Sequence, residues 1–151
     1  MEDMRSVRLS DEARDEFLGR GGTGVLSFAS DVDQPPYTIP VSYGYDAEET
    51  TFYFRLAMGE DHGKTEFVDR DRPVSLVVSD RTDDGWRSVV ASGTLNEVTE
   101  GAVGNEILDR MARIQLPLVD VFDRDPREVT FRFFRLRPTE IGARAEAKSD
   151  D

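Results

Sequence analysis

The fold is decided by one stretch of the sequence, Tyr37-Thr38-Ile39-Pro40-Val41-Ser42-Tyr43-Gly44-Tyr45 followed after a short gap by Thr51-Phe52-Tyr53-Phe54-Arg55-Leu56-Ala57-Met58. Apolar side chains recur at every second position in both halves, which is the pattern of a β-strand with one buried face. The turn-forming residues 46–50 join the two halves and predict a hairpin. The expected buried faces carry Ile39, Val41, Tyr43 and Tyr45 on the first strand, and Phe52, Phe54, Leu56 and Met58 on the second.

Four further segments have the length and composition of strands, at residues 24–29, 73–80, 86–98 and 129–136. The segment 86–98 is broken at Gly93, where we expect a bend or bulge. Short helices are predicted from the Ser10 N-cap to Leu18, over 64–71 and over 100–114. Because few helices alternate with the strands, the sequence predicts a mainly β fold, a six-stranded antiparallel barrel with attached short helices.

The chain has 151 residues, the size of one ordinary domain. We expect a single domain over residues 1–143 and an acidic, disordered tail over 144–151. No cysteine is present, which excludes disulfides, thiolate metal sites and a cysteine nucleophile. The N-terminal residues lack the apolar segment of a signal peptide, and no apolar run is long enough to span a membrane, so a cytoplasmic protein is expected.

Acidic residues number 31 and basic residues 19, which gives a formal net charge of −12. This charge argues against nucleic acid and anionic membranes as partners. Only two of the basic residues are lysines, Lys64 and Lys148. An acidic surface almost without lysine indicates adaptation to concentrated salt, although an acidic protein from a high-GC genome would have the same composition.

Pro40 and the loop before Lys64 are the features that suggest a binding site. A proline inside a strand removes a ladder donor, so this strand is expected to leave its backbone free to meet another group. Lys64 and Thr65 stand where a polar loop turns into a predicted helix, and Arg55 ends the preceding strand. These groups could hold a phosphate; pairing of Arg55 and Lys64 with local carboxylates is the alternative.

Hydrolytic and metal-dependent chemistry find little support in the sequence. His62 is the only histidine and lies in a loop rich in glycine and acidic residues, where a solvated surface group is the simpler interpretation. No second histidine or cysteine exists to complete a transition-metal site. We therefore expect no metal and assign no acid–base catalyst.

The order and spacing of several blocks resemble the flavin-binding split-barrel family, whose best-known members are the pyridoxamine 5′-phosphate oxidases. The resemblance covers about residues 24–98, and it is carried by the blocks at 37–46, 51–55, 63–64, 72–78 and 86–95. It implies a homodimer that binds FMN at the subunit interface. The residues it implies for the cofactor are Thr38, Ile39, Pro40, Val41 and Ser42 along the flavin ring, Phe54, Arg55 and Leu56 beside the ribityl chain, Arg55, Lys64 and Thr65 at the phosphate, and Trp86 and Ser88.

Within this resemblance, Ser88 would reach the flavin from the second subunit. Trp86 would either pack on the ring or fill the end of the barrel. The dense aromatic segment 131–134 has phenylalanines on both faces, which fits either a contact between subunits or packing under the helix predicted at 100–114.

Departures from the family pattern argue against vitamin B6 oxidation. Thr38 and Tyr43 occupy positions where the oxidases carry basic residues, Gly63 replaces a frequent arginine, and no histidine follows His62. The pattern is closer to the branch that includes nitroimidazole-reductase-like proteins. The expected function is an FMN-dependent oxidoreductase fed by a reduced nicotinamide; the alternatives are a non-catalytic flavin-binding sensor or storage module, and a split barrel that uses deazaflavin F420 or, with less support, haem.

Overall fold

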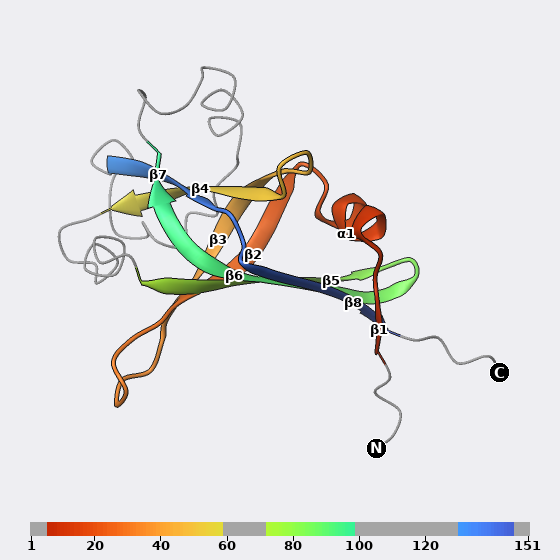
Figure 1. Ribbon diagram of the computed structural model, residues 1–151, viewed down its shortest axis with the longest axis horizontal. Coiled ribbons are helices and arrows are strands. Elements are labelled where there is room, and N and C mark those ends of the chain that lie inside the picture. The colour runs from red at the N-terminus through yellow and green to blue at the C-terminus, as the bar shows by residue number, and fades with distance from the viewer. Residues whose placement is uncertain (1–5, 59–71, 99–129, 147–151) are drawn as a thin grey trace.

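The computed structural model describes residues 6–58, 72–98 and 130–146 (Figure 1). The predicted helices at 64–71 and 100–114, together with His62, Lys64 and Thr65, lie outside these ranges. The described strands are β1 (Ser6–Arg8), β2 (Gly21–Phe28), β3 (Tyr37–Asp46), β4 (Thr51–Met58), β5 (Pro73–Thr82), β6 (Gly85–Glu97), β7 (Thr130–Leu136) and β8 (Glu140–Glu146), and helix α1 (Asp11–Leu18) lies between β1 and β2.

All pairings between the described strands are antiparallel, and they form one sheet in the order β1-β8-β6-β5-β2-β3-β4-β7. An additional pairing of β6 with β7 closes six of these strands into a ring. The ring strands are the six predicted from the sequence, so the six-stranded barrel is confirmed. Strands β8 and β1 extend the sheet beyond the ring and were not predicted.

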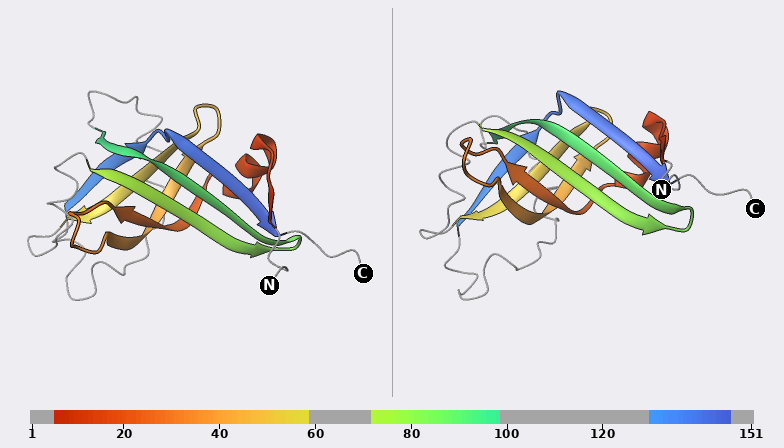
Figure 2. Two further views of the ribbon diagram at one scale, coloured as in Figure 1. Left: turned by 60° about the horizontal axis from the view of Figure 1, so that its bottom comes forward. Right: turned by 90° about the horizontal axis from the view of Figure 1, so that it is seen from below.

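Strand β8 also changes the expected C-terminal boundary. Residues 144–146, which the sequence assigned to the start of a tail, are the last residues of β8, and Arg144 pairs with Ser88 of β6. Figure 2 shows β5, β6 and β8 running together past the barrel toward the two ends of the chain.

Gly93 marks the point where β6 exchanges one partner for another. Residues Arg87–Ser92 of β6 pair with β8, whereas Leu95–Glu97 pair with β7. The register between β5 and β6 continues through Gly93 without an extra residue, so of the bend or bulge expected there the bulge is excluded. A Cβ atom at this position would lie 3.0 Å from Leu136 Cδ1 and 3.1 Å from the carbonyl oxygen of Arg137. Glycine is therefore needed because the chain passing from β7 to β8 lies directly against it.

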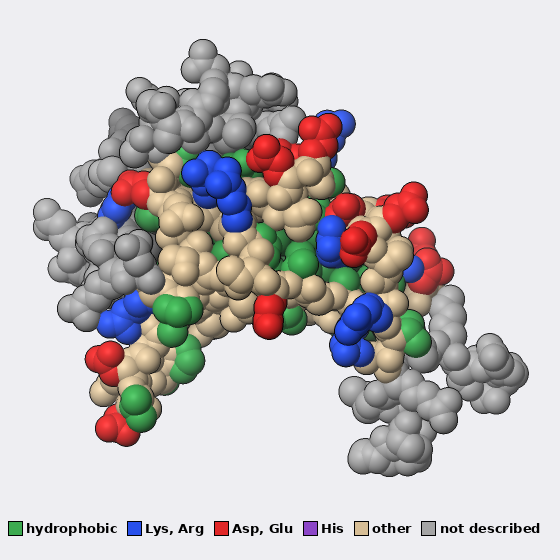
Figure 3. All heavy atoms as spheres, in the orientation of Figure 1, with side chains coloured by type: hydrophobic (Ala, Val, Ile, Leu, Met, Phe, Trp, Pro, Cys, Tyr) green, Lys and Arg blue, Asp and Glu red, His purple; other side chains and the backbone are tan. Residues whose placement is uncertain are grey.

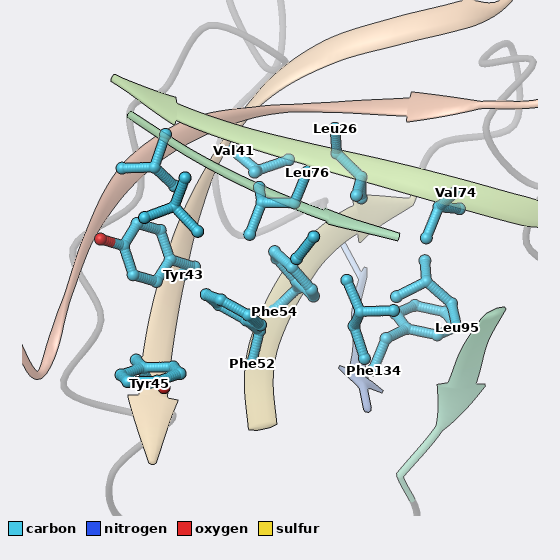
Figure 4. Packing of buried hydrophobic residues seen from close by; sticks show 14 of the residues in the cluster. Leu26, Val41, Tyr43, Tyr45, Phe52, Phe54, Val74, Leu76, Leu95 and Phe134 are labelled. Carbon is cyan, nitrogen blue, oxygen red and sulfur yellow. The ribbon is translucent and has the colours of Figure 1, made fainter. Parts of the chain in front are cut away.

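The core fills the inside of the ring, as the strand alternation predicted. Figure 4 shows aromatic side chains of β3 and β4 pointing toward leucine and valine side chains of neighbouring strands. The Phe52 ring lies 5.8 Å from that of Tyr43 and 4.8 Å from that of Tyr45, measured between centroids. The largest fully buried apolar side chains are Phe28, Phe52, Phe54, Phe134, Leu18, Leu26, Leu76, Leu136 and Val89.

Helix α1 packs against one end of this core through Leu18. Its predicted N-cap is confirmed, since the Ser10 hydroxyl accepts a hydrogen bond of 3.1 Å from the Ala13 N–H. Gly19 ends the helix with φ 61°, and its N–H donates to the Asp15 carbonyl at 3.0 Å. No helix among the described residues is long and apolar enough to cross a membrane.

Candidate functional site

Strands β3 and β4 separate part-way along their length. They pair only where Tyr43–Asp46 of β3 meet Thr51–Phe54 of β4. Beyond that point, residues 37–42 of β3 pair with β2, and residues 55–58 of β4 pair with β7. We call the opening between residues 37–42 and residues 55–58 the split. Each of these two edges lacks a ladder across the split, in the part of the chain that the structure describes.

Pro40 lies on the β3 edge of the split. It faces Val25 of β2 and has no strand partner on the side of β4 among the described residues. This placement confirms the sequence interpretation that a strand with a proline here leaves one edge unpaired.

The predicted ring-contacting stretch Thr38–Ser42 divides between the two faces of β3. The side chains of Ile39 and Val41 are buried in the core, so only their backbone groups can meet a ligand. Thr38 and Pro40 are exposed on the outer face, where the Thr38 hydroxyl lies 3.0 Å from that of Ser27. Ser42 is buried.

Strand β4 divides in the same way. Phe54 and Leu56 point into the core and are almost fully buried, so they can flank a ligand only through their backbone. Arg55 lies between them on the outer face, half-buried, directly after the last residue paired with β3. The structure thus brings the Arg55 guanidinium close to the split, whereas Lys64 and Thr65 stay predictions.

Trp86 and Ser88 lie far from the split. Trp86 stands next to the turn between β5 and β6, opposite Arg81, and 50% of its surface is exposed. Its backbone N–H donates to a carboxylate oxygen of Glu146 at 3.2 Å. A half-exposed tryptophan at this turn does not fill the end of the barrel, so that alternative is wrong.

The strand register allows the distance between Ser88 and Thr38 to be estimated. A line of partners joins Thr38 through Ser27 and Ser75 to Ser92, and Ser88 lies four residues further along β6. With strands about 4.8 Å apart and a rise of about 3.3 Å per residue, the two side chains are separated by roughly 14 Å across the sheet and 13 Å along it. One flavin ring cannot contact both in a single chain.

The outer face of the sheet between Thr38 and Ser88 carries no charged side chain. A line of cross-strand partners, which we call the valine row, crosses five strands: Pro40, Val25, Val77, Val90 and Gly142. The three valines are 41%, 39% and 45% exposed. A parallel line of hydroxyl side chains lies beside it: Thr38, Ser27, Ser75 and Ser92. Charged residues make up 33% of the chain, so an exposed uncharged strip of this length is a distinct surface feature.

Sequence reasoning did not identify the outer face of β4 and β7. Here Arg55 is opposite Phe133, and Tyr53 is opposite Arg135. The alternation of β7 could have placed Phe133 and Arg135 on one face, but nothing in the sequence shows that β7 pairs with β4. Among the described residues, no group of three His, Cys, Asp or Glu side chains could hold a metal ion.

Comparison with protein families gives a match over nearly the whole chain. The model of the family described as pyridoxamine 5′-phosphate oxidase matches residues 10–145. The chain belongs to this family. The membership confirms the resemblance drawn from residues 24–98 and extends it across β7 and β8.

Solved structures similar to this member of the pyridoxamine 5′-phosphate oxidase family share its fold. A FAD-binding protein from Mesorhizobium loti has a TM-score of 0.68 and 22% identity, over 95% of this chain and 100% of that one. The FAD binding protein from Mycobacterium smegmatis has a TM-score of 0.63 and 17% identity, over 94% and 100% of the two chains. A FAD and heme binding protein from Mycobacterium smegmatis has a TM-score of 0.65 and 13% identity, over 97% and 75%. Comparison with the curated proteins finds no match.

Proposed function

We propose that the protein is a flavin-dependent oxidoreductase that binds FMN at the split, with a reduced nicotinamide as electron donor. The observation that carries the proposal is the early end of the β3–β4 ladder at Tyr43 and Phe54, which leaves a backbone edge on β3 beside a guanidinium on β4. Family membership and the FAD-binding proteins among the similar structures support a flavin. A bound flavin would supply the hydride or electron transfer, and the protein would supply position and electrostatics.

The residues of the split fit a flavin by their chemistry. The polar edge of the flavin ring needs backbone donors and acceptors, and residues 37–42 offer an edge that no described strand occupies from the side of β4. The phosphate needs cations, and Arg55 can give it two parallel hydrogen bonds. Lys64 and Thr65 are proposed to complete the phosphate site.

We further propose that the site is shared between two copies of the chain. Ser88 and Trp86 are too far from Thr38 to reach the same ring within one chain, so a second copy would bring them to it. The valine row gives that copy an exposed apolar surface that begins at Pro40, on the edge of the split. A two-fold contact buries the same surface on both copies, so one strip serves both partners.

The first experiment is an absorbance spectrum of the purified protein in concentrated salt, followed by denaturation and mass determination of any released ligand. Added FMN is then titrated into wild type, Arg55→Gln and Arg20→Gln. Arg20 is exposed at the end of α1 and matches the loss of charge. We expect Arg55→Gln to weaken FMN binding by roughly tenfold or more, because a charge-assisted phosphate contact is lost, and Arg20→Gln to have little effect.

The outcomes separate the proposed oxidoreductase from its alternatives. A colourless wild-type protein that binds no added FMN would contradict the proposal. A protein that binds FMN but oxidises NADH or NADPH no faster than free FMN does, with several acceptors, would be a flavin-binding module instead. Binding of F420 in preference to FMN would replace the cofactor and keep the site.

A further inference from the structure

Two arginines lie directly opposite each other where β1 and β8 extend the sheet past the barrel. Arg8 of β1 and Arg144 of β8 are cross-strand partners. Ala143 is buried in the core, so its neighbour Arg144 and the opposing Arg8 point to the outer face, where both are exposed. Figure 3 shows Lys and Arg side chains gathered over the ends of β8 and β1. This end of the sheet therefore presents two neighbouring positive charges.

Nothing within the described ranges neutralises this pair of charges. Like charges that face each other across a ladder destabilise it. Neither guanidinium forms an ion pair with a described residue, although the chain has 31 acidic residues against 19 basic ones. Arg144 donates a hydrogen bond of 3.2 Å to the Ser6 hydroxyl, which orients its guanidinium but leaves its charge. An anion between Arg8 and Arg144 would remove the repulsion and accept hydrogen bonds from both.

Arg132 of β7 shows the contrasting case of an arginine that is paired inside the protein. Two of its guanidinium nitrogens donate to the two carboxylate oxygens of Glu97, at 2.9 and 2.8 Å, and this pair lowers the pKa of Glu97. The outward-facing carboxylate next to Arg144 along β8 is that of Glu146, and one of its oxygens accepts the Trp86 N–H at 3.2 Å. Glu146 therefore holds the start of β6 and forms no ion pair with Arg144.

The two arginines belong to a line of cross-strand partners that runs through Ser88. Arg144 is opposite Ser88 of β6, and Ser88 is opposite Ser79 of β5. Neighbouring strands are about 4.8 Å apart, so Arg8 lies only two strand spacings from Ser88. Trp86, which is half-exposed, stands two residues before Ser88 and shares its face. An anion bound by the arginines would therefore lie beside the two side chains that a second copy is proposed to bring to the flavin.

We propose that Arg8 and Arg144 bind the diphosphate of the reduced nicotinamide dinucleotide that serves as electron donor. This inference rests on the proposed function, because the second copy must bring Ser88 and Trp86, and the arginines with them, to the flavin. Two adjoining phosphate groups match two guanidinium groups on neighbouring strands. Each guanidinium can give a phosphate two parallel hydrogen bonds, which makes arginine better suited to this role than lysine. The donor would then approach the flavin from the side of Ser88.

The first test uses inorganic pyrophosphate as the probe and needs no flavin. Pyrophosphate is titrated at constant ionic strength into wild type, Arg144→Gln, Arg8→Gln and Arg20→Gln, with binding followed by calorimetry and by the fluorescence of Trp86, the only tryptophan. We expect saturable binding by wild type. Arg144→Gln and Arg8→Gln should each lose roughly tenfold or more in affinity, because one charge-assisted contact is removed. Arg20 is exposed in the turn after α1, so Arg20→Gln should bind as wild type does.

Steady-state kinetics connect this anion site with the electron donor. In Arg144→Gln and Arg8→Gln, the KM for NADH or NADPH should rise by roughly tenfold while kcat changes little, because binding of the donor is weakened and not the transfer itself. The affinity for FMN should change less than about twofold, since the split is untouched. Pyrophosphate should compete with the donor in wild type. Arg144→Lys keeps the charge and should recover part of the affinity for pyrophosphate and for the donor.

Three results would overturn the inference and leave the proposed function standing. They are wild type that binds FMN but no pyrophosphate, arginine variants that bind pyrophosphate as tightly as wild type, and variants whose KM for the donor is unchanged. If Arg144→Gln fails to fold, shown by its circular dichroism spectrum, Arg8→Gln decides, because β1 has only three residues and all are exposed. Wild type that binds pyrophosphate through both arginines but binds no flavin contradicts the proposed function itself.

Discussion

Tyr43 of β3 and Phe54 of β4 are the last partners of the ladder between these two strands. Up to this pair the strands form an ordinary hairpin, and beyond it each follows a different neighbour. The pair is anchored from inside, since both side chains are in the core and the Tyr43 hydroxyl donates to the Leu18 carbonyl at 3.2 Å. Packing of Tyr43 and Phe54 in the core therefore fixes the position at which the split begins.

Gly93 gives the first prediction, which concerns stability. Replacement by alanine would place a Cβ atom against Leu136 and the backbone of Arg137, both of which belong to the passage from β7 to β8. We expect Gly93→Ala to lower the free energy of unfolding by about 1–3 kcal/mol, the usual cost of overpacking. Urea denaturation followed by circular dichroism measures this change.

The matched control is Gly142→Ala. Gly142 lies on the neighbouring strand β8, and a Cβ atom there would meet nothing within 4 Å. We expect its effect to be small or slightly stabilising, because alanine restricts the unfolded chain. An equal decrease in the free energy of unfolding of the two variants would show that the close approach at Gly93 does not destabilise the alanine variant.

The sequence predicted the ring strands and the core-facing residues of β3 and β4 because both depend on local alternation. It did not predict that Thr51 and Tyr53, on the opposite face of β4, are buried as well. Ile39, Val41, Tyr43 and Tyr45 are all buried, as the period-2 pattern of β3 required. It could not predict where a strand changes partner, since that depends on residues distant in the chain. A lone glycine in a strand indicates either a bulge or a change of partner. The sequence alone therefore did not show that β6 exchanges β8 for β7 at Gly93.

The missed elements had weak local signals. Strand β1 has only three residues, all exposed. Strand β8 alternates the small apolar residues Ala143 and Ala145 with charged ones, which in sequence resembles a polar tail.

Tyr43 gives a prediction about pH. Burial raises its pKa to about 12, while an unfolded tyrosine titrates near 10. Because the folded state holds the neutral phenol, this stabilisation is fully present below pH 10 and is lost as the pH rises from 10 to 12. Burial and the hydrogen bond to Asp15 also raise the pKa of Tyr45 to about 12, so Tyr45 adds to the same loss of stability.

The measurement is the free energy of unfolding between pH 9 and 12 for wild type and Tyr43→Phe. Two units of pKa correspond to about 2.7 kcal/mol at most for one group. We expect Tyr43→Phe to lose stability less steeply over this range, with Tyr45 and Tyr53, whose pKa burial also raises, responsible for what is left. If the free energy of unfolding of Tyr43→Phe falls with pH as steeply as that of wild type, the Tyr43 hydroxyl of wild type ionises as readily in the folded protein as in the unfolded chain.

The valine row gives a prediction about assembly. Val77 lies at its centre, with Val25 and Val90 as cross-strand partners on either side. If two copies meet on this strip, Val77→Asp places a charge in the contact on both copies, and the unpaired buried charges should separate the dimer. Light scattering after size-exclusion chromatography in concentrated salt should give a dimer for wild type and a monomer for Val77→Asp.

Val32→Asp is the control for this change. Val32 is 99% exposed in the loop before β3, so the same substitution is made away from the valine row. We expect Val32→Asp to keep the wild-type mass. A monomeric wild type, or a dimer that survives Val77→Asp, would contradict a contact through this strip.

Trp86 gives a prediction that connects assembly with flavin binding. It is the only tryptophan in the chain, so the intrinsic tryptophan fluorescence reports on one place next to the turn between β5 and β6. In a shared site this indole lies beside the flavin held by the other copy, and flavin binding should quench its emission. In Val77→Asp the two places are separated, so the same flavin concentration should leave the emission nearly unchanged. Quenching of equal size in both proteins would place Trp86 beside the flavin of its own chain and would remove the reason for a second copy in the site.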